Sequence, residues 1–145
     1  MNLKAELNKG KSTYDLRWKK SLKTGDYDIL SKSKFESQVQ FFYNQYCQFI
    51  LKKIVDNFPN KKLKDLKILE VGCGRGTASI YLSKVLECEV IGIDFSEVSI
   101  EIAKNNAEYH KVKPVFLVAD IFDKDSLKKK NIFENDFDVI SFYPV

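Results

Sequence analysis

Residues 68–77 read ILEVGCGRGT, and this stretch decides the fold of the 145-residue chain. Its first four residues form an apolar run interrupted only by Glu70, which favours a short strand buried on both faces. Glycines stand at positions 72, 74 and 76, where the missing Cβ lets the chain turn or approach a ligand closely. Apolar residues then follow at helical spacing, namely Ala78, Leu82, Val85 and Leu86. The sequence therefore predicts a strand, a glycine turn and a helix whose first N–H groups face a ligand.

Two widespread glycine motifs do not match this turn. The dinucleotide fingerprint G-x-G-x-x-G requires a glycine at position 77, where the chain has Thr77. The phosphate-binding P-loop ends in Gly-Lys-Ser/Thr, which does not follow here. The motif present is E-x-G-x-G-x-G. A glycine turn in some other α/β protein stays an alternative, because short motifs also match by chance.

Three further apolar segments extend the pattern, at residues 89–94, 115–120 and 137–142. The first two end on the carboxylates Asp94 and Asp120, and Ser96 is a good N-cap for the helix after the first. Residues 123–135 are polar and predict a loop with a short helix. This alternation indicates a parallel α/β sheet, which binds ligands at the carboxyl ends of its strands. Glu70, Asp94 and Asp120 are therefore predicted to share one edge of the sheet.

The motifs together resemble those of a known enzyme family. The stretch ILEVGCGRGT is similar to the first motif of class I S-adenosylmethionine-dependent methyltransferases. VIGIDFSEVSIEIAKNNA (90–107) looks like the second motif of that family, and FLVADIFD (116–123) looks like the third. The resemblance covers residues 66–142. It implies a Rossmann-like parallel sheet, S-adenosyl-L-methionine as cofactor and methyl transfer to an acceptor that the sequence does not identify.

The resemblance implies that the amino-acid end of the cofactor lies against Glu70 and the glycine turn. The residues of that turn are Gly72, Cys73, Gly74 and Gly76. S-adenosylmethionine carries an ammonium, a carboxylate and a sulfonium but no pyrophosphate, so an acidic residue beside the glycines is useful. For Cys73 the sequence favours a small packing side chain over a nucleophile, because it places no histidine nearby.

The remaining implied contacts lie at the ends of the later strands. Asp94 would bind the ribose hydroxyls, and Phe95 would flank the adenine. Asp120 would accept a hydrogen bond from the adenine amine, with Ile121 packed on the ring, and Ser141 would pass the methionine moiety. Each carboxylate taken alone also fits a helix cap or a solvated strand end. All three together with the glycines favour the cofactor site.

Two departures from the family pattern concern the end of the sequence. The family has seven strands in the order 3-2-1-4-5-7-6, whereas this chain predicts four. Residues 61–145 therefore read as an incomplete cofactor-binding core, truncated after the fourth strand, whose apolar edge is open to a partner chain. Residues 141–144, Ser-Phe-Tyr-Pro, differ from the Asn-Pro-Pro-Tyr signature for amino groups of bases or glutamine, which leaves the acceptor open to a small molecule or a protein.

Residues 1–60 are predicted to form an N-terminal arm and an amphipathic helix. Residues 1–30 fit a flexible arm, a lid or plain surface packing. The helix is predicted over residues 33–57, with a capping box from Ser33 to Glu36. Its apolar stripe consists of Phe35, Val39, Phe42, Tyr46, Phe49, Ile50 and Ile54. We expect this stripe to pack against the face or edge of the sheet.

Composition narrows the partners and the compartment. Hydrophobic residues make up 44% of the chain, which is enough for a core. The net charge of +4 comes from lysines scattered among acidic residues, which favours a solvated surface over a nucleic-acid patch. Three cysteines without C-x-x-C spacing favour reduced thiols and no metal site. With a polar N-terminal stretch and no long apolar run, the sequence predicts a cytoplasmic protein that does not insert into membranes.

Three functional hypotheses follow. The first is the cofactor-binding half of an S-adenosylmethionine-dependent methyltransferase. The second is a non-catalytic cofactor-binding module, or a subunit of a larger complex that supplies the rest. The third, a nucleotide-linked oxidoreductase, is disfavoured by Thr77.

Overall fold

The computed structural model describes Lys19 and residues 37–142. Apart from Lys19, the predicted N-terminal arm lies outside the described residues, as do the capping box at residues 33–36 and residues 143–145. The main elements, in chain order, are α2 (Ser37–Asn57), β1 (Lys67–Val71), α3 (Thr77–Leu86), β2 (Glu89–Asp94), α4 (Glu97–His110), β3 (Val115–Val118), α5 (Lys124–Lys129) and β4 (Val139–Phe142). Single 3-10 turns lie at Leu63–Asp65 and Glu134–Asp136.

The strands form one parallel sheet in the order β3-β2-β1-β4. This confirms the predicted Rossmann-like α/β class and puts the glycine stretch on a central strand. In the register, Glu70 of β1 lies beside Gly92 of β2 and Ser141 of β4. The third strand is shorter than predicted and ends at Val118, although Ala119 N still donates to Asp94 O at 2.9 Å. Asp120 therefore lies just past the strand.

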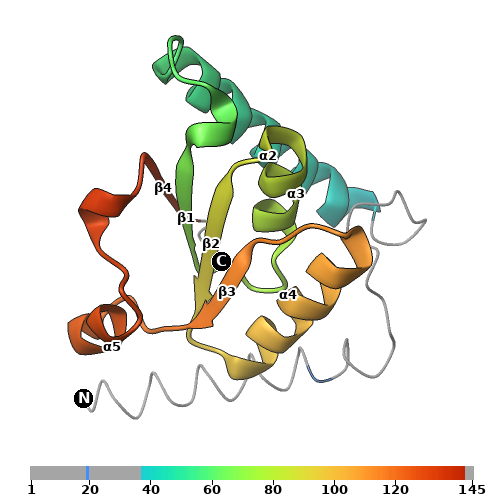
Figure 1. The fold of residues 1–145 in the computed structure, drawn as a ribbon. Coiled ribbons are helices and arrows are strands. Elements are labelled where there is room, and N and C mark those ends of the chain that lie inside the picture. The colour runs from blue at the N-terminus through green and yellow to red at the C-terminus, as the bar shows by residue number, and fades with distance from the viewer. Residues whose placement is uncertain (1–18, 20–36, 143–145) are drawn as a thin grey trace, which may run out of the picture.

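Helices cover the two faces of the sheet unequally. Figure 1 shows α2, α3 and α4 on one side of the sheet and α5 on the other. On the first side, one cluster joins α2 and α3 to the sheet through Ile54, Leu82 and Val90, and a second lies around Phe116 under α4. On the α5 side the buried cluster of the described residues consists of Leu69, Ile93, Ala119 and Ile132, with partly buried side chains packed against it. The glycine turn and its helix thus lie on the better-covered face.

Helix α2 packs on that face, but not through the whole predicted stripe. Ile50 and Ile54 are buried as predicted, and Tyr46 is half-buried. The prediction that Phe49 is buried is wrong, because its side chain is 58% exposed and lies under the Lys53 ammonium. Cys47 is buried instead, since the 47-50-54 spacing turns position 49 away from the sheet. The side chains of Phe35, Val39 and Phe42 lie outside the described part.

Two glycines let the helices approach the sheet closely, and both face the ring of Phe116. A Cβ on Gly76 would lie 2.6 Å from a Phe116 ring carbon and 3.0 Å from the Ala103 Cβ. A Cβ on Gly92 would lie 2.8 Å from two atoms of the same ring. Because real Cβ atoms do not come this close, these glycines are required by packing.

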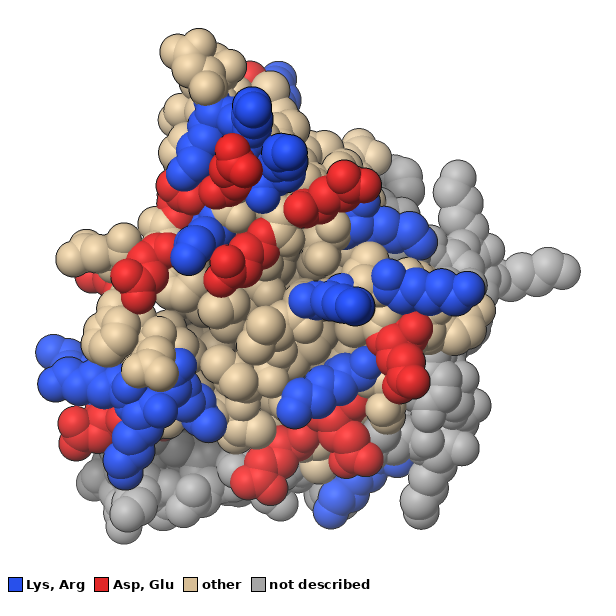
Figure 2. All heavy atoms as spheres, viewed as in Figure 1, with Lys and Arg blue, Asp and Glu red and all other residues tan. Residues whose placement is uncertain are grey.

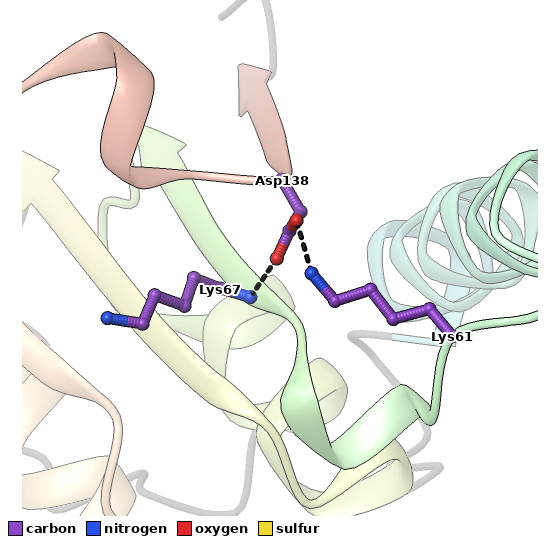
Figure 3. Close-up of polar contacts among 3 residues, drawn as sticks. All are labelled: Lys61, Lys67 and Asp138. Atoms are coloured by element: carbon purple, nitrogen blue, oxygen red, sulfur yellow. Dashed lines mark hydrogen bonds and ion pairs between the residues drawn. The ribbon is translucent and has the colours of Figure 1, made fainter.

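Strand β4 is fixed at both ends by side chains. At its start, the Asp138 carboxylate accepts hydrogen bonds from Lys61 Nζ at 2.5 Å and from the backbone N–H of Lys67 at 2.9 Å (Figure 3). At its end, the Tyr46 hydroxyl donates to the carbonyl of Phe142 at 3.1 Å. Helix α2 therefore reaches the carboxyl edge of the sheet.

Charged side chains of both signs are mixed over the visible face, and lysines gather around α5 (Figure 2). This distribution agrees with the predicted solvated, lysine-rich surface. None of the helices in the described residues is long and apolar enough to span a membrane.

Candidate functional site

The glycine turn follows β1 and curls against the end of β2. Gly72, Gly74 and Gly76 all have positive φ, at 71°, 53° and 82°, a conformation that favours glycine. The N–H groups of Gly72 and Cys73 both donate to the carbonyl of Ile93, at 2.8 and 3.0 Å. The sheet therefore uses these two N–H groups, whereas the N–H groups predicted to face a ligand are those of the first turn of the following helix.

The two ends of the turn have different surroundings. A Cβ on Gly72 would meet nothing within 4 Å, so this residue borders open space. Gly76 is instead the N-cap of α3, and a Cβ on it would overlap the Phe116 ring. The structure therefore separates the predicted contacts: Gly72 faces space that a ligand can enter, whereas Gly76 serves the packing of the helix.

Asp94 ends β2 and holds the turn. Its Oδ2 accepts from Gly74 N and its Oδ1 from Ser96 N, both at 2.9 Å. Its side chain is buried. Ser96 caps α4, as predicted, by accepting from Ser99 N. A carboxylate oxygen can accept two hydrogen bonds, so the predicted ribose contact is compatible with the bonds that Asp94 already accepts.

The next predicted contacts line the same edge. Asp120 is half-buried, and its Oδ1 accepts from Phe122 N at 2.9 Å. Phe95 and Ile121 are 37% and 41% exposed, so both present apolar surface to the edge. Phe122 was not singled out from the sequence, yet it is 84% exposed. The signal available in the sequence is its position two residues after Asp120.

Glu70 is the most deeply buried of the three carboxylates. Its side chain has no exposed surface, and Ser79 Oγ donates to its Oε2 at 2.5 Å. The pKa of Glu70 is raised to about 7, mainly by burial and to a smaller extent by the charge of Asp94, although the hydroxyl and backbone N–H of Ser79 lower it. The sequence could not show Ser79, because the contact depends on how α3 lies over the sheet.

Two buried polar atoms beside this carboxylate lack partners. Among the described residues, neither Glu70 Oε1 nor Ser141 Oγ has a hydrogen bond. The two residues are neighbours across β1 and β4. Buried polar atoms are normally satisfied, so the pair is suited to a polar group supplied from outside the chain.

Cys73 has no role as a nucleophile in this arrangement. Its thiol is fully buried against Ile80, Ile100 and Phe116. Burial raises its pKa well above the ordinary value, with smaller contributions from Glu70 and Asp94. The predicted packing role is confirmed, and Cys47, Cys73 and Cys88 are all free thiols.

The chemistry of the edge selects the kind of ligand. Carboxylates at Glu70, Asp94 and Asp120 suit ammonium, amine and hydroxyl donors. A pyrophosphate would lack hydrogen-bond donors here, because the N–H groups of Gly72, Cys73 and Gly74 already donate within the protein. The residues fit a small molecule with an ammonium group, a ribose and an aromatic base.

Comparisons with known proteins agree with this geometry. A family model described as "Methyltransferase domain" matches residues 62–143. A ribosomal protein L11 methyltransferase of Acetivibrio thermocellus is 36% identical over 74 residues, which are 50% of this chain and 24% of that protein. A ubiquinone biosynthesis O-methyltransferase of Pelagibacter ubique is 35% identical over 91 residues, 60% of this chain and 36% of that protein.

A solved structure shares the fold. It is an S-adenosylmethionine-dependent methyltransferase from Clostridium acetobutylicum, with a TM-score of 0.55 and 23% identity. The match covers 69% of this chain and 36% of that one. This chain therefore spans less than half the length of each of these three proteins.

Proposed function

Because this chain belongs to the class I S-adenosylmethionine-dependent methyltransferases, we propose that its carboxyl edge binds S-adenosylmethionine for methyl transfer to a small-molecule or protein acceptor. The observation that carries the proposal is the open space beside Gly72, which follows Glu70 by two residues and belongs to the turn whose Gly74 N–H donates to Asp94. A ligand with a cationic end and a ribose matches both neighbours.

Each part of the cofactor has a candidate partner. Its amino-acid end would lie beside Glu70, Gly72 and Ser141, where two buried polar atoms lack partners among the described residues. Its ribose would bind Asp94, which is anchored by the backbone of the turn. Cys73, Gly74 and Gly76 would act by shaping the turn.

The adenine would lie further along the edge. Phe95 and Ile121 offer exposed apolar surface for the two faces of the base. Asp120 would accept from the exocyclic amine. Its Oδ1 already accepts from Phe122 N, which fixes the orientation of the carboxylate.

S-adenosylmethionine supplies a methyl group that its sulfonium makes electrophilic, so the protein need not generate a reactive group. The residues of the edge would orient the cofactor and keep water from it. No general base is assigned. One relative is named for a ribosomal protein and another for ubiquinone biosynthesis, so both a protein and a small molecule stay open as acceptors.

We also propose that a further strand, from a partner chain, covers the outer edge of β4. Within the described sheet this strand pairs only with β1. Ile140 and Phe142 are 44% and 69% exposed on the thinly covered face. The free thiols fit the cytoplasmic location that we propose for the protein.

Isothermal titration calorimetry tests the binding step. S-adenosylhomocysteine is expected to bind with one site per chain, and NAD at the same concentration is expected to give no heat of binding. A tritium-labelled methyl assay with protein and small-molecule acceptors then tests transfer. If S-adenosylhomocysteine does not bind, the proposed function is wrong. If it binds and no acceptor is labelled, the chain is a cofactor-binding module.

A further inference from the structure

We propose that Ser79 is a positioning residue for Glu70, and that binding of the cofactor expels a proton from the Glu70 carboxyl group. The inference rests on the proposed function, because it needs a ligand with an ammonium group at this edge.

Three elements place Ser79 against the carboxylate. Ser79 lies in the first turn of α3 and has no exposed surface. Its hydroxyl donates to Glu70 Oε2 at 2.5 Å. Gly92, the neighbour of Glu70 on β2, provides the room, because a Cβ there would lie 2.9 Å from Ser79 Oγ. The hydrogen bond therefore depends on a glycine outside the glycine turn.

One oxygen is thereby fixed and the other left open. With Oε2 held by Ser79, the carboxyl group cannot rotate freely, so Oε1 keeps one orientation. Oε1 is buried, and no described residue donates a hydrogen bond to it. Ser141 Oγ, across the strand pair, is likewise unsatisfied among the described side chains.

The surroundings disfavour a charged carboxylate when no ligand is bound. The titratable groups that face Glu70 are Cys47 from α2, Cys73 from the glycine turn and Asp94 from β2. Burial raises the pKa of Cys47 to about 12 and that of Cys73 well above its ordinary value, so both thiols are neutral. Asp94 is an acid. Among the described residues, no cation faces Glu70 to compensate a negative charge on its carboxylate.

An ammonium bound at the edge reverses this balance. It stabilises the ionised carboxylate, so Glu70 gives up its proton, and the proton passes to the solvent. Since the pKa of Glu70 in the free protein is about 7, part of the population must lose a proton on binding at neutral pH. Affinity then rises with pH until Glu70 is ionised beforehand.

Ser79 sets where this transition falls. Its hydrogen bond stabilises the ionised form and lowers the pKa of Glu70. Without the hydroxyl the pKa is higher, so the same affinity is reached only at higher pH. A residue that merely supported the fold would lower affinity equally at every pH.

The test is calorimetric titration of the whole chain with S-adenosylhomocysteine between pH 6 and pH 8.5. Each point is measured in phosphate and in Tris, because the difference in observed heat gives the number of protons released. For the wild type, affinity should rise by roughly tenfold per pH unit below the pKa of Glu70 and level off above it. A fraction of a proton should be released at pH 7.

Variants assign the effect to its residues. Glu70→Gln should bind with nearly constant affinity over this range and release no proton. Ser79→Ala should shift the affinity curve to higher pH. Ser83→Ala changes a serine one turn further along α3 and should match the wild type. His110→Asn removes the only histidine of the chain, which corrects for any proton that it contributes.

The outcomes separate this inference from the proposed function. Binding with the same affinity at every pH and the same heat in both buffers would overturn the coupling while leaving the cofactor site intact. A Ser79→Ala curve that is only lowered, and not shifted, would overturn the role of Ser79. Should Ser79→Ala lose its circular dichroism signal, the comparison of Glu70→Gln with the wild type still decides the coupling. No binding at any pH would overturn both proposals.

Discussion

The carboxylate of Asp138 accepts a hydrogen bond from the ammonium of Lys61 at 2.5 Å. It also accepts from Lys67 N at 2.9 Å, and the N–H of Asp138 donates to the carbonyl of Lys67 at 2.9 Å. One side chain thus joins the approach to β1 with the start of β4. These bonds, led by that from Lys61, lower the pKa of Asp138. The ion pair itself is partly solvated, at 37% and 23% side-chain exposure.

The backbone bond should contribute more than the ion pair. Asp138→Ala removes both, and we expect a loss of about 1–2 kcal/mol in the free energy of unfolding. Lys61→Met removes only the ion pair and should cost less than about 1 kcal/mol. Urea unfolding measures both, and equal losses would contradict this ranking. Because the pKa of Asp138 is lowered, its contribution should be present above its ordinary value of 3.8 and fade as pH falls through the lowered value.

The first and last glycines of the turn should respond differently to alanine. Gly72→Ala places a Cβ in open space at φ 71°, so its cost in stability should be only the conformational strain, about 1–2 kcal/mol. Gly76→Ala carries a similar strain and also overlaps the Phe116 ring, so it should unfold at lower urea concentration. Calorimetry should show that Gly72→Ala loses S-adenosylhomocysteine affinity. Full affinity in that variant would mean that Gly72 serves the turn alone.

The buried carboxyl of Glu70 should make stability depend on pH. Its pKa is about 7 in the folded chain against an ordinary 4.5, so between these values the folded state holds more protons than the unfolded state. The contribution of Glu70 to stability is therefore lost as pH rises from 4.5 to 7. The unfolding free energy of Glu70→Gln minus that of the wild type should therefore increase by about 3 kcal/mol as pH rises from 4.5 to 8.

Urea unfolding of both proteins at pH 4.5, 6 and 8 measures that difference. Gln keeps an acceptor for Ser79, so the variant changes the charge with little change in shape. A stability difference that is flat with pH would show that Glu70 titrates normally.

Asp94→Ala should weaken S-adenosylhomocysteine binding by about 1.5–3 kcal/mol, because hydrogen bonds to a charged acceptor are lost. The variant also releases the N–H groups of Gly74 and Ser96, so stability should fall with it. Ser96→Ala is the matched control, since it removes the cap of α4 and leaves Asp94 in place. It should lose about 1 kcal/mol of stability and keep its affinity. Unchanged affinity in a folded Asp94→Ala would remove the ribose assignment.

The strand-turn-helix at residues 68–86 and the cap at Ser96 were predictable because local spacing decides them. The rotation of α2 was not, since Phe49 and Cys47 are both apolar and only the packing of the helix on the sheet selects between them. The Ser79 contact with Glu70 was hidden for a similar reason: it depends on Gly92, a residue of another strand. Likewise, the hydrogen bond from Gly74 N to Asp94 joins the glycine turn to the end of β2, and the distance between these two elements cannot be predicted from residue spacing.

The ring of Phe116 has a consequence for how sequences with this fold can diverge. It fills the volume that side chains at positions 76 and 92 would otherwise take. These two sites, one in the turn and one in a strand, are therefore not independent under mutation. An alanine at position 92 should be accepted only together with a smaller residue at position 116. Positions 92 and 116 should therefore covary among homologous sequences. Position 76 would stay glycine even then, because its φ of 82° excludes most side chains whatever stands at 116.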